Sequence, residues 1–315
     1  MAASVELSVV IPVYDEEAVL AALFERLYPA LDALGVAYEV VFVNDGSRDR
    51  SAALLTDQFH RRPEVTRVVM FDGNFGQHRA ILAGFEHARG ERIVTLDADL
   101  QNPPEDIHLL LGQMDAGHDY VGSIRRLRDD PLWRRLASRA MNRLRERTTG
   151  IRMTDQGCMM RAYSRRIADT INRCNELHTF IPALAWQFAR NPTEVVVGHE
   201  ERFAGESKYS LFSLIRLNFD LMTGFSVMPL HLLSLVGMLL SILSGVLVVV
   251  LVVRRLAIGP EEGGLFTLFA IEFLLMGITL FGIGLLGEYI GRIYQEVRQR
   301  PRYMISAVLE KRDEP

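Results

Sequence analysis

Two aspartates and a glutamine stand at alternate positions directly after a hydrophobic run. Asp97, Asp99 and Gln101 follow the apolar stretch that begins at Arg92. Residues i, i+2 and i+4 of an extended backbone point the same way, so we expect these three side chains to converge on one hard cation. Their oxygen atoms suit Mg²⁺ or Mn²⁺, which complete their shells with water and substrate phosphates. The alternative is a turn in which both aspartates only cap backbone groups.

The segments that position these residues alternate between strand and helix patterns. Hydrophobic runs predict strands at 7–13, 38–44, 65–71 and 92–96, and amphipathic stretches predict helices at 16–34 and 77–88. This alternation indicates an α/β fold with a mostly parallel, Rossmann-like sheet covered by helices on both faces. Ligands of such sheets bind at the carboxyl ends of the strands, where the polar residues of this chain are found.

Polar residues after the first two predicted strands could bind a nucleotide. Tyr14 could stack on a base, Glu16 could accept a hydrogen bond from it or cap the next helix, and Asp45 could accept from a base or ribose. Each one alone is also explained by an ordinary cap or turn. Together with Asp97 and Asp99 they predict a pocket for a nucleoside diphosphate. Neither a Walker motif nor a dinucleotide glycine motif follows the first strand, which argues against an ATPase or a nicotinamide enzyme.

Basic residues further along could meet the charge of the phosphates. Arg202 and Lys208 flank Gly205, which suits a loop that closes over a diphosphate, or alternatively a basic pair that touches lipid headgroups. The arginine-rich stretch 131–148 has apolar residues at helical spacing, which favours an amphipathic helix in the membrane interface over one packed on the domain. Asp155 follows this stretch and could act as a general base or orient an acceptor.

Two long apolar stretches lie near the C-terminus, where most of the 49% hydrophobic content of the chain is concentrated. Leu230–Val253 and Leu265–Gly287 are each long enough to cross a hydrocarbon core of ~30 Å, so we expect two membrane spans. Within the second stretch we expect Glu272 to pack against a partner, since an ionisable residue there is either packed or functional. No signal peptide precedes residue 10, and arginines follow the second stretch, so we expect both ends of the chain in the cytoplasm.

The cysteine content and the charge narrow the function classes further. Cys158 and Cys174 suit a reducing compartment and predict no disulfide framework. The formal net charge of -4 argues against a general affinity for nucleic acid.

Seven motifs distributed over essentially the whole chain resemble the polyisoprenyl-phosphate glycosyltransferases of the inverting GT-A type. They are PVYDEE, NDGS, NFGQH, LDADLQNPPE, TDQGCMMRAY, RFAGESKYS and GLLGEYIGRIYQEVRQRPRY. The resemblance implies a GT-A catalytic domain over 1–208 that includes the interfacial helix, then a juxtamembrane amphipathic segment over 209–229. Two transmembrane helices over 230–287 and a cytoplasmic tail over 288–315 complete the implied organisation.

The resemblance also implies roles for individual residues. Those that would hold the nucleotide are Pro12, Tyr14, Glu16, Val43 and Asp45. Those of the metal site are Asp97, Asp99 and Gln101, with Asp99 also catalytic and Ala98 beside the nucleotide. Those that would contact phosphates are Arg125, Arg202 and Lys208, although Arg126 and Arg128 are as well placed as Arg125. Asp155 would lie near the acceptor as the catalytic base.

The implied reaction is transfer of a sugar from UDP to undecaprenyl phosphate, with inversion, at the bacterial inner membrane. Because a phosphate monoester has a second pKa near ~6, the acceptor is already largely dianionic and needs no strong base. The family members most similar in NFGQH, in Gly157–Tyr163 and in Thr179–Pro182 transfer 4-deoxy-4-formamido-L-arabinose, a lipid A modification connected with polymyxin resistance. Glucose or mannose donors remain alternatives, as does a non-catalytic membrane protein that only binds nucleotides. The resemblance further suggests a homo-oligomer, a tetramer.

Overall fold

The computed structural model describes residues 5–125, 153–155, 157–174, 180–200, 227–259, 265–298 and 301–311. These residues belong to two compact units. One holds the β-sheet and the helices packed on it, and the other holds two long helices.

The first unit is built on an eight-stranded sheet in the order β7-β5-β6-β4-β1-β2-β3-β8. The strands are β1 (Leu7–Val13), β2 (Tyr38–Asn44), β3 (Thr66–Phe71), β4 (Arg92–Thr95), β5 (Tyr120–Arg125), β6 (Arg161–Ser164), β7 (Pro192–Val197) and β8 (Ile305–Leu309). All run parallel except β6 and β8, which pair antiparallel with their neighbours. The mostly parallel sheet is therefore confirmed, and the four strands predicted from hydrophobic runs are present within one residue at each end.

Helices cover both faces of this sheet, as its alternating pattern predicts. On one face lie α1 (Leu20–Asp32), α2 (Ser51–Arg61) and α4 (Ile107–Asp115), and on the other lie α3 (Gln77–His87), α6 (Arg165–Arg173) and α7 (Ile181–Phe188). Successive residues of a strand serve opposite faces, so Val9 belongs to the core under α1, while Val10 meets α3. α3 approaches so closely that a Cβ atom on Gly84 would lie 2.2 Å from a Val10 methyl group.

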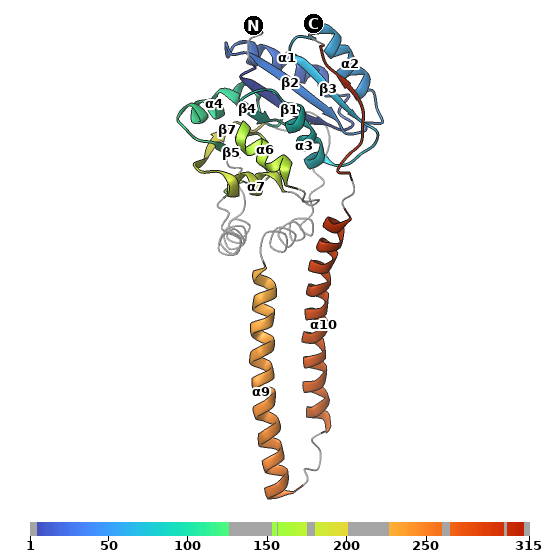
Figure 1. Cartoon of the computed structure of the whole chain (residues 1–315), viewed down its shortest axis with the longest axis vertical. Coiled ribbons are helices and arrows are strands. Elements are labelled where there is room, and N and C mark those ends of the chain that lie inside the picture. Colours follow the sequence, from blue (N-terminus) through green and yellow to red (C-terminus); the bar gives the residue numbers. More distant parts are fainter. Residues whose placement is uncertain are drawn as a thin grey trace. The chain divides into compact units, whose positions relative to one another are not determined.

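The strand β8 comes from the C-terminal end of the chain and forms the edge of the sheet. It pairs antiparallel with β3, and Figure 1 shows it in red beside that strand. Just before it, the Tyr303 ring stacks on Phe71 with centroids 4.9 Å apart, and Asp72 N donates to Met304 O at 3.0 Å. The sequence predicted only a tail over 288–315. Part of that tail, β8, follows both long helices in the chain and forms the last strand of the sheet.

The second unit consists of α9 (Met228–Ile258) and α10 (Leu265–Val297), which lie side by side in Figure 1. They contain apolar stretches of 29 and 21 residues, Leu230–Ile258 and Ile271–Gly291, with mean hydropathies of 2.9 and 1.8. Helices of this length and composition can cross a membrane, in agreement with the two predicted spans. Their apolar side chains are exposed, a surface that lipid would cover.

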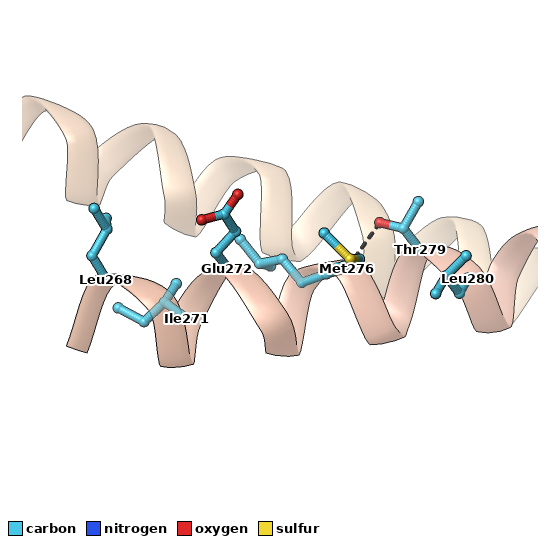
Figure 2. Close-up of a pocket in the computed structure, with 7 residues that line it drawn as sticks. Leu268, Ile271, Glu272, Met276, Thr279 and Leu280 are labelled. Carbon is cyan, nitrogen blue, oxygen red and sulfur yellow. Dashed lines mark hydrogen bonds between the residues drawn. The ribbon is translucent and has the colours of Figure 1, made fainter. Parts of the chain in front are cut away.

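A hollow of about 520 Å³ lies on α10 (Figure 2). Its polar lining groups are Glu272 and Thr279, and the Thr279 hydroxyl donates to the Leu275 carbonyl of the same helix at 2.8 Å. A threonine bonded to its own helix and one carboxylate do not form a catalytic constellation, whereas the sheet carries a larger group of polar residues.

Candidate active site

The loops after β1 and β2 are joined to each other at the carboxyl edge of the sheet. The register pairs the last residues of the two strands, so both loops leave the sheet at the same level. Asp15 N donates to Ser47 Oγ at 3.1 Å, and Arg48 N donates back to Asp15 Oδ1 at 2.7 Å. Glu16 N donates to Ser51 Oγ at 2.9 Å. These reciprocal bonds turn two separate loops into one rigid rim.

The rim exposes some of the residues predicted to hold the nucleotide and buries others. Tyr14 is 39% exposed and can offer its ring to a base. Pro12 and Val43 face each other in the register of β1 and β2, and both are buried. Ala98 is also buried, with 3% of its surface exposed. These three residues present almost no surface to a ligand, and their predicted contacts with a nucleotide stay predictions.

Asp45 is buried and holds the loop that leads into α3. Its two carboxylate oxygens accept hydrogen bonds from Phe75 N at 2.7 Å and Gly76 N at 2.8 Å. Burial raises the pKa of Asp45, and the two backbone N–H groups offset only part of that rise. Next to it, Gly46 has a φ of +67°, and a Cβ atom there would lie 2.3 Å from the Gly73 backbone. Asp45 therefore shapes the Phe75–Gln77 loop, and a ribose or base would share a carboxylate that is already engaged.

Asp97–Gln101 forms a turn, so the prediction of an extended segment with three side chains on one face is wrong. β4 ends at Thr95, and Leu100 adopts a φ of +58°, a left-handed conformation that is strained for a branched residue. Asp99 Oδ1 accepts from Gln101 N at 3.1 Å, the local bond that turns favour. Strained residues of this kind concentrate at ligand sites, where the surrounding structure holds them.

The turn nevertheless presents chemistry that suits a divalent cation. Asp97 Oδ1 accepts from the Gln77 side-chain amide of α3 at 2.6 Å, which orients one carboxylate. Within the described part of the chain, no three His, Cys, Asp or Glu residues gather as a metal cluster. Mg²⁺, however, is commonly held by one or two carboxylates and completed by water and substrate phosphates. Asp97 and Asp99, with the Gln101 amide nearby in the chain, fit this kind of site.

Asp155 forms a bidentate ion pair with Arg125 at the end of β5. Arg125 Nε donates to Asp155 Oδ2 at 2.7 Å, and Arg125 Nη2 donates to Oδ1 at 2.9 Å. Oδ1 also accepts from Gly157 N at 2.9 Å. Burial by itself would raise the pKa of Asp155, but the guanidinium and the backbone N–H groups outweigh it and hold the pKa below its usual range. A carboxylate in this state is a weak base.

A buried arginine side chain anchors the Asp155 loop. Arg161, with no exposed surface, donates to the carbonyls of Asp155 and Cys158, both at 2.7 Å, and to the Tyr120 hydroxyl at 2.6 Å. Glu194 of β7 accepts from Thr154 N at 2.9 Å on the other side of the loop. Removing a guanidinium from water costs free energy, and the hydrogen bonds to these neutral acceptors must be well placed to offset that cost.

The Asp97–Gln101 turn and the Arg125–Asp155 pair form one group at the carboxyl edge of the sheet. The charge of Asp97 helps to raise the pKa of Arg125, so the Asp97–Gln101 turn, the candidate metal turn, lies within electrostatic reach of the Arg125–Asp155 pair. Gln77, Arg161 and Glu194 were not predicted to belong to the site. Two signals in the sequence point to them, namely the glutamine inside NFGQH and an arginine directly after the apolar residues 158–160.

Several predicted elements lie outside the described residues. They are Arg126, Arg128, Arg202, Lys208, the helix 131–148 and most of the segment 209–229. Their predicted roles stay predictions.

Comparison with known proteins identifies the family of this chain. The model of the family "Glycosyl transferase family 2" matches residues 8–171, which include the rim, the metal turn and the Arg125–Asp155 pair. The chain belongs to glycosyl transferase family 2. This glycosyltransferase is 50% identical to an undecaprenyl-phosphate 4-deoxy-4-formamido-L-arabinose transferase of Yersinia enterocolitica, over 96% of this chain and 94% of the relative. It is 49% identical to the protein of the same name from an Enterobacter species, over 97% and 94%.

Among solved structures, the family 2 glycosyltransferase is similar to glucosyl-3-phosphoglycerate synthase from Mycobacterium tuberculosis. The TM-score is 0.46 at 18% identity, over 70% of this chain and 79% of that chain. Enzymes of this family generally use divalent metal ions, in keeping with the carboxylates of the Asp97–Gln101 turn.

Proposed function

We propose that this glycosyltransferase moves 4-deoxy-4-formamido-L-arabinose from UDP to undecaprenyl phosphate, inverting the anomeric centre. The observation that carries the proposal is the identity of about half of all residues with transferases of that name, over nearly the full length of both chains. The similarity spans the rim, the Asp155 loop and both long helices, so it includes the elements that we propose to bind the donor and the acceptor. Lipid A modification and polymyxin resistance would be the consequences of this activity.

On the donor side, the rim would hold the uridine, with Tyr14 as a stacking platform and with Glu16 and Asp45 beside it. Asp97 and Asp99, with Gln101, would hold Mg²⁺ or Mn²⁺. Such an ion supplies Lewis-acid neutralisation of a departing diphosphate. Arg202 and Lys208 would add charge-assisted hydrogen bonds to the same diphosphate.

On the acceptor side, Arg125 would bind the lipid phosphate. A phosphate oxygen would form the new bond to the anomeric carbon while the bond to the UDP oxygen breaks, and UDP departs with that electron pair. No proton has to be removed from a dianionic phosphate. Asp155, whose carboxylate is engaged by Arg125, would orient the guanidinium and would not serve as the general base named in the sequence analysis.

The same proposal places the reaction at the cytoplasmic face of the bacterial inner membrane. β8 follows α9 and α10 in the chain yet is hydrogen-bonded to β3, so the segments before and after the two long helices lie on the same side of any membrane that the helices cross. Two crossings satisfy this condition. The helix 131–148 would rest in the interface, and a homo-oligomer, a tetramer, would be the assembled form.

The test is a transfer assay with the purified full-length protein, undecaprenyl phosphate and separate UDP-sugars with Mg²⁺ or Mn²⁺. We expect a lipid-linked product with UDP-4-deoxy-4-formamido-L-arabinose, identified by mass spectrometry, and the opposite anomeric configuration by NMR. Product only from glucose or mannose donors would replace the proposed sugar. Absence of product from every donor, with UDP still bound, would favour the non-catalytic nucleotide-binding alternative for this chain.

A further inference from the structure

Arg26 of α1 holds two glutamates at once. Arg26 Nε and Nη2 donate to the two carboxylate oxygens of Glu105 at 3.0 and 2.9 Å. Arg26 Nη1 and Nη2 donate to the two oxygens of Glu200 at 2.9 and 3.0 Å. The guanidinium is thus bidentate toward both partners, a geometry that a lysine cannot reproduce.

The two glutamates come from segments that meet beside the metal turn. Glu105 lies in the 3₁₀ helix η1 (Pro104–Asp106), shortly after Gln101, and Glu200 lies three residues after the end of β7. Glu200 N donates to Gln101 O at 2.9 Å, and Gly198 N donates to Asp106 Oδ2 at 2.6 Å. Since Gln101 N in turn donates to Asp99, a continuous path of bonds leads from Arg26 to a carboxylate of the metal turn.

We propose that Arg26 is a positioning residue for the donor site, a role that rests on the proposed function. It anchors the segment after β7 against the segment after the metal turn, and through Gln101 it sets the place of Asp99. Without the guanidinium, two neighbouring carboxylates would repel each other and push the two segments apart at the point where they must hold their separation.

A second ion pair of the same unit shows what a purely structural role would look like. Arg62 donates to both oxygens of Asp32, the last residue of α1, at 3.1 Å. The exposed fractions of the arginine side chains are nearly equal, 30% for Arg62 and 32% for Arg26. Asp32 accepts from Tyr38 at the start of β2, at the opposite edge of the sheet from the metal turn. Arg62→Gln is therefore a matched control for Arg26→Gln.

The experiment compares purified full-length wild type, Arg26→Gln, Arg26→Lys and Arg62→Gln. Titration calorimetry measures UDP binding with Mn²⁺, the transfer assay gives KM for the donor, and thermal unfolding gives Tm. We expect Arg26→Gln to weaken UDP binding and raise the donor KM by about 10- to 100-fold, the range for groups that orient metal ligands. Arg26→Lys should lie between wild type and Arg26→Gln, and Arg62→Gln should lower Tm similarly while UDP binding stays unchanged.

Equal UDP affinity and donor KM in Arg26→Gln and Arg62→Gln would overturn the inference. It would also be overturned if Arg26→Lys had the UDP affinity and donor KM of the wild type. Should Arg26→Gln fail to fold, Glu200→Gln breaks the same link from the other side and carries the same outcomes. A wild type that binds UDP and forms no lipid-linked product would refute the proposed function, while the comparison of UDP affinities would still decide the role of Arg26.

Discussion

The Asp97–Gln101 turn and the Asp155 loop both bring carboxylates to the carboxyl edge of the sheet, but they surround them differently. Asp97 accepts from the Gln77 amide, and Asp99 accepts from a backbone N–H. Asp155 accepts two hydrogen bonds from a guanidinium and another from Gly157 N. The Gln77 amide and the Gln101 N–H orient the carboxylates of the turn, whereas the Arg125 guanidinium forms an ion pair with Asp155 and fixes its position. We therefore propose a cation site at the turn and a positioning role for Asp155 in the loop.

The largest effect should come from removing charge at the turn. We expect Asp99→Asn to lower the transfer rate by on the order of 10²–10³, the scale for losing one group that stabilises developing charge. The rate of lipid-linked product formation at saturating metal measures it. Asp115→Asn is the control, because its carboxylate pairs with Arg92, the first residue of β4, at the other edge of the sheet. Equal losses in the two variants would contradict the assignment of the turn.

Removing the Arg125 guanidinium should have the second largest effect. Arg125→Gln takes away hydrogen bonds to a charged group, each worth roughly 1.5–3 kcal/mol, so we expect the KM for undecaprenyl phosphate to rise by about 10- to 100-fold. The donor KM should change much less, because the proposed function assigns Arg125 to the acceptor phosphate. Steady-state kinetics with each substrate varied in turn separates the two. A change confined to the donor KM would reverse the assignment.

Asp155→Asn should have a smaller effect than either. If Asp155 only orients Arg125, the rate should fall about tenfold, the scale expected for an orienting group, with UDP affinity kept. The acid limb of the pH–rate profile should stay near ~6, where the acceptor phosphate titrates. A loss of several orders of magnitude, or an acid limb that disappears, would instead restore Asp155 as the general base.

The same pair gives a pH dependence of stability. Because the folded state lowers the pKa of Asp155, the ion pair contributes stability above the unfolded carboxyl pKa of ~3.9 and loses it as the pH falls through the folded value. The difference in Tm between wild type and Asp155→Asn should therefore be constant from about pH 8 to pH 5 and shrink below about pH 4. Calorimetric scans over this range measure it; a difference that grew toward acid pH would mean that the pKa is raised.

The smallest effect should come from Gln77→Ala. Loss of one neutral hydrogen bond to Asp97 costs roughly 0.5–1.5 kcal/mol, so the metal concentration for half-maximal activity should rise by about 2- to 12-fold. Activity titrated with Mn²⁺ measures it. Thr56→Ala, which removes only a bond from a hydroxyl to its own helix, is the control. A shift as large as that of Asp99→Asn would mean that Gln77 is itself a ligand.

Local patterns in the sequence determined the strands β1 to β4, the mostly parallel sheet, the two long apolar helices and the rim on which the polar residues gather. Hydrophobic periodicity carries this information because each strand and helix is defined by residues close together in the chain. Tertiary structure decided the rest: the antiparallel return of β8, the left-handed turn at Leu100, and the pairing of residues 20 to 30 positions apart in Gln77–Asp97 and Arg125–Asp155. The charge state of a carboxylate depends on such distant partners, so the same residue type belongs to a proposed cation site in one loop and to an arginine ion pair in the other.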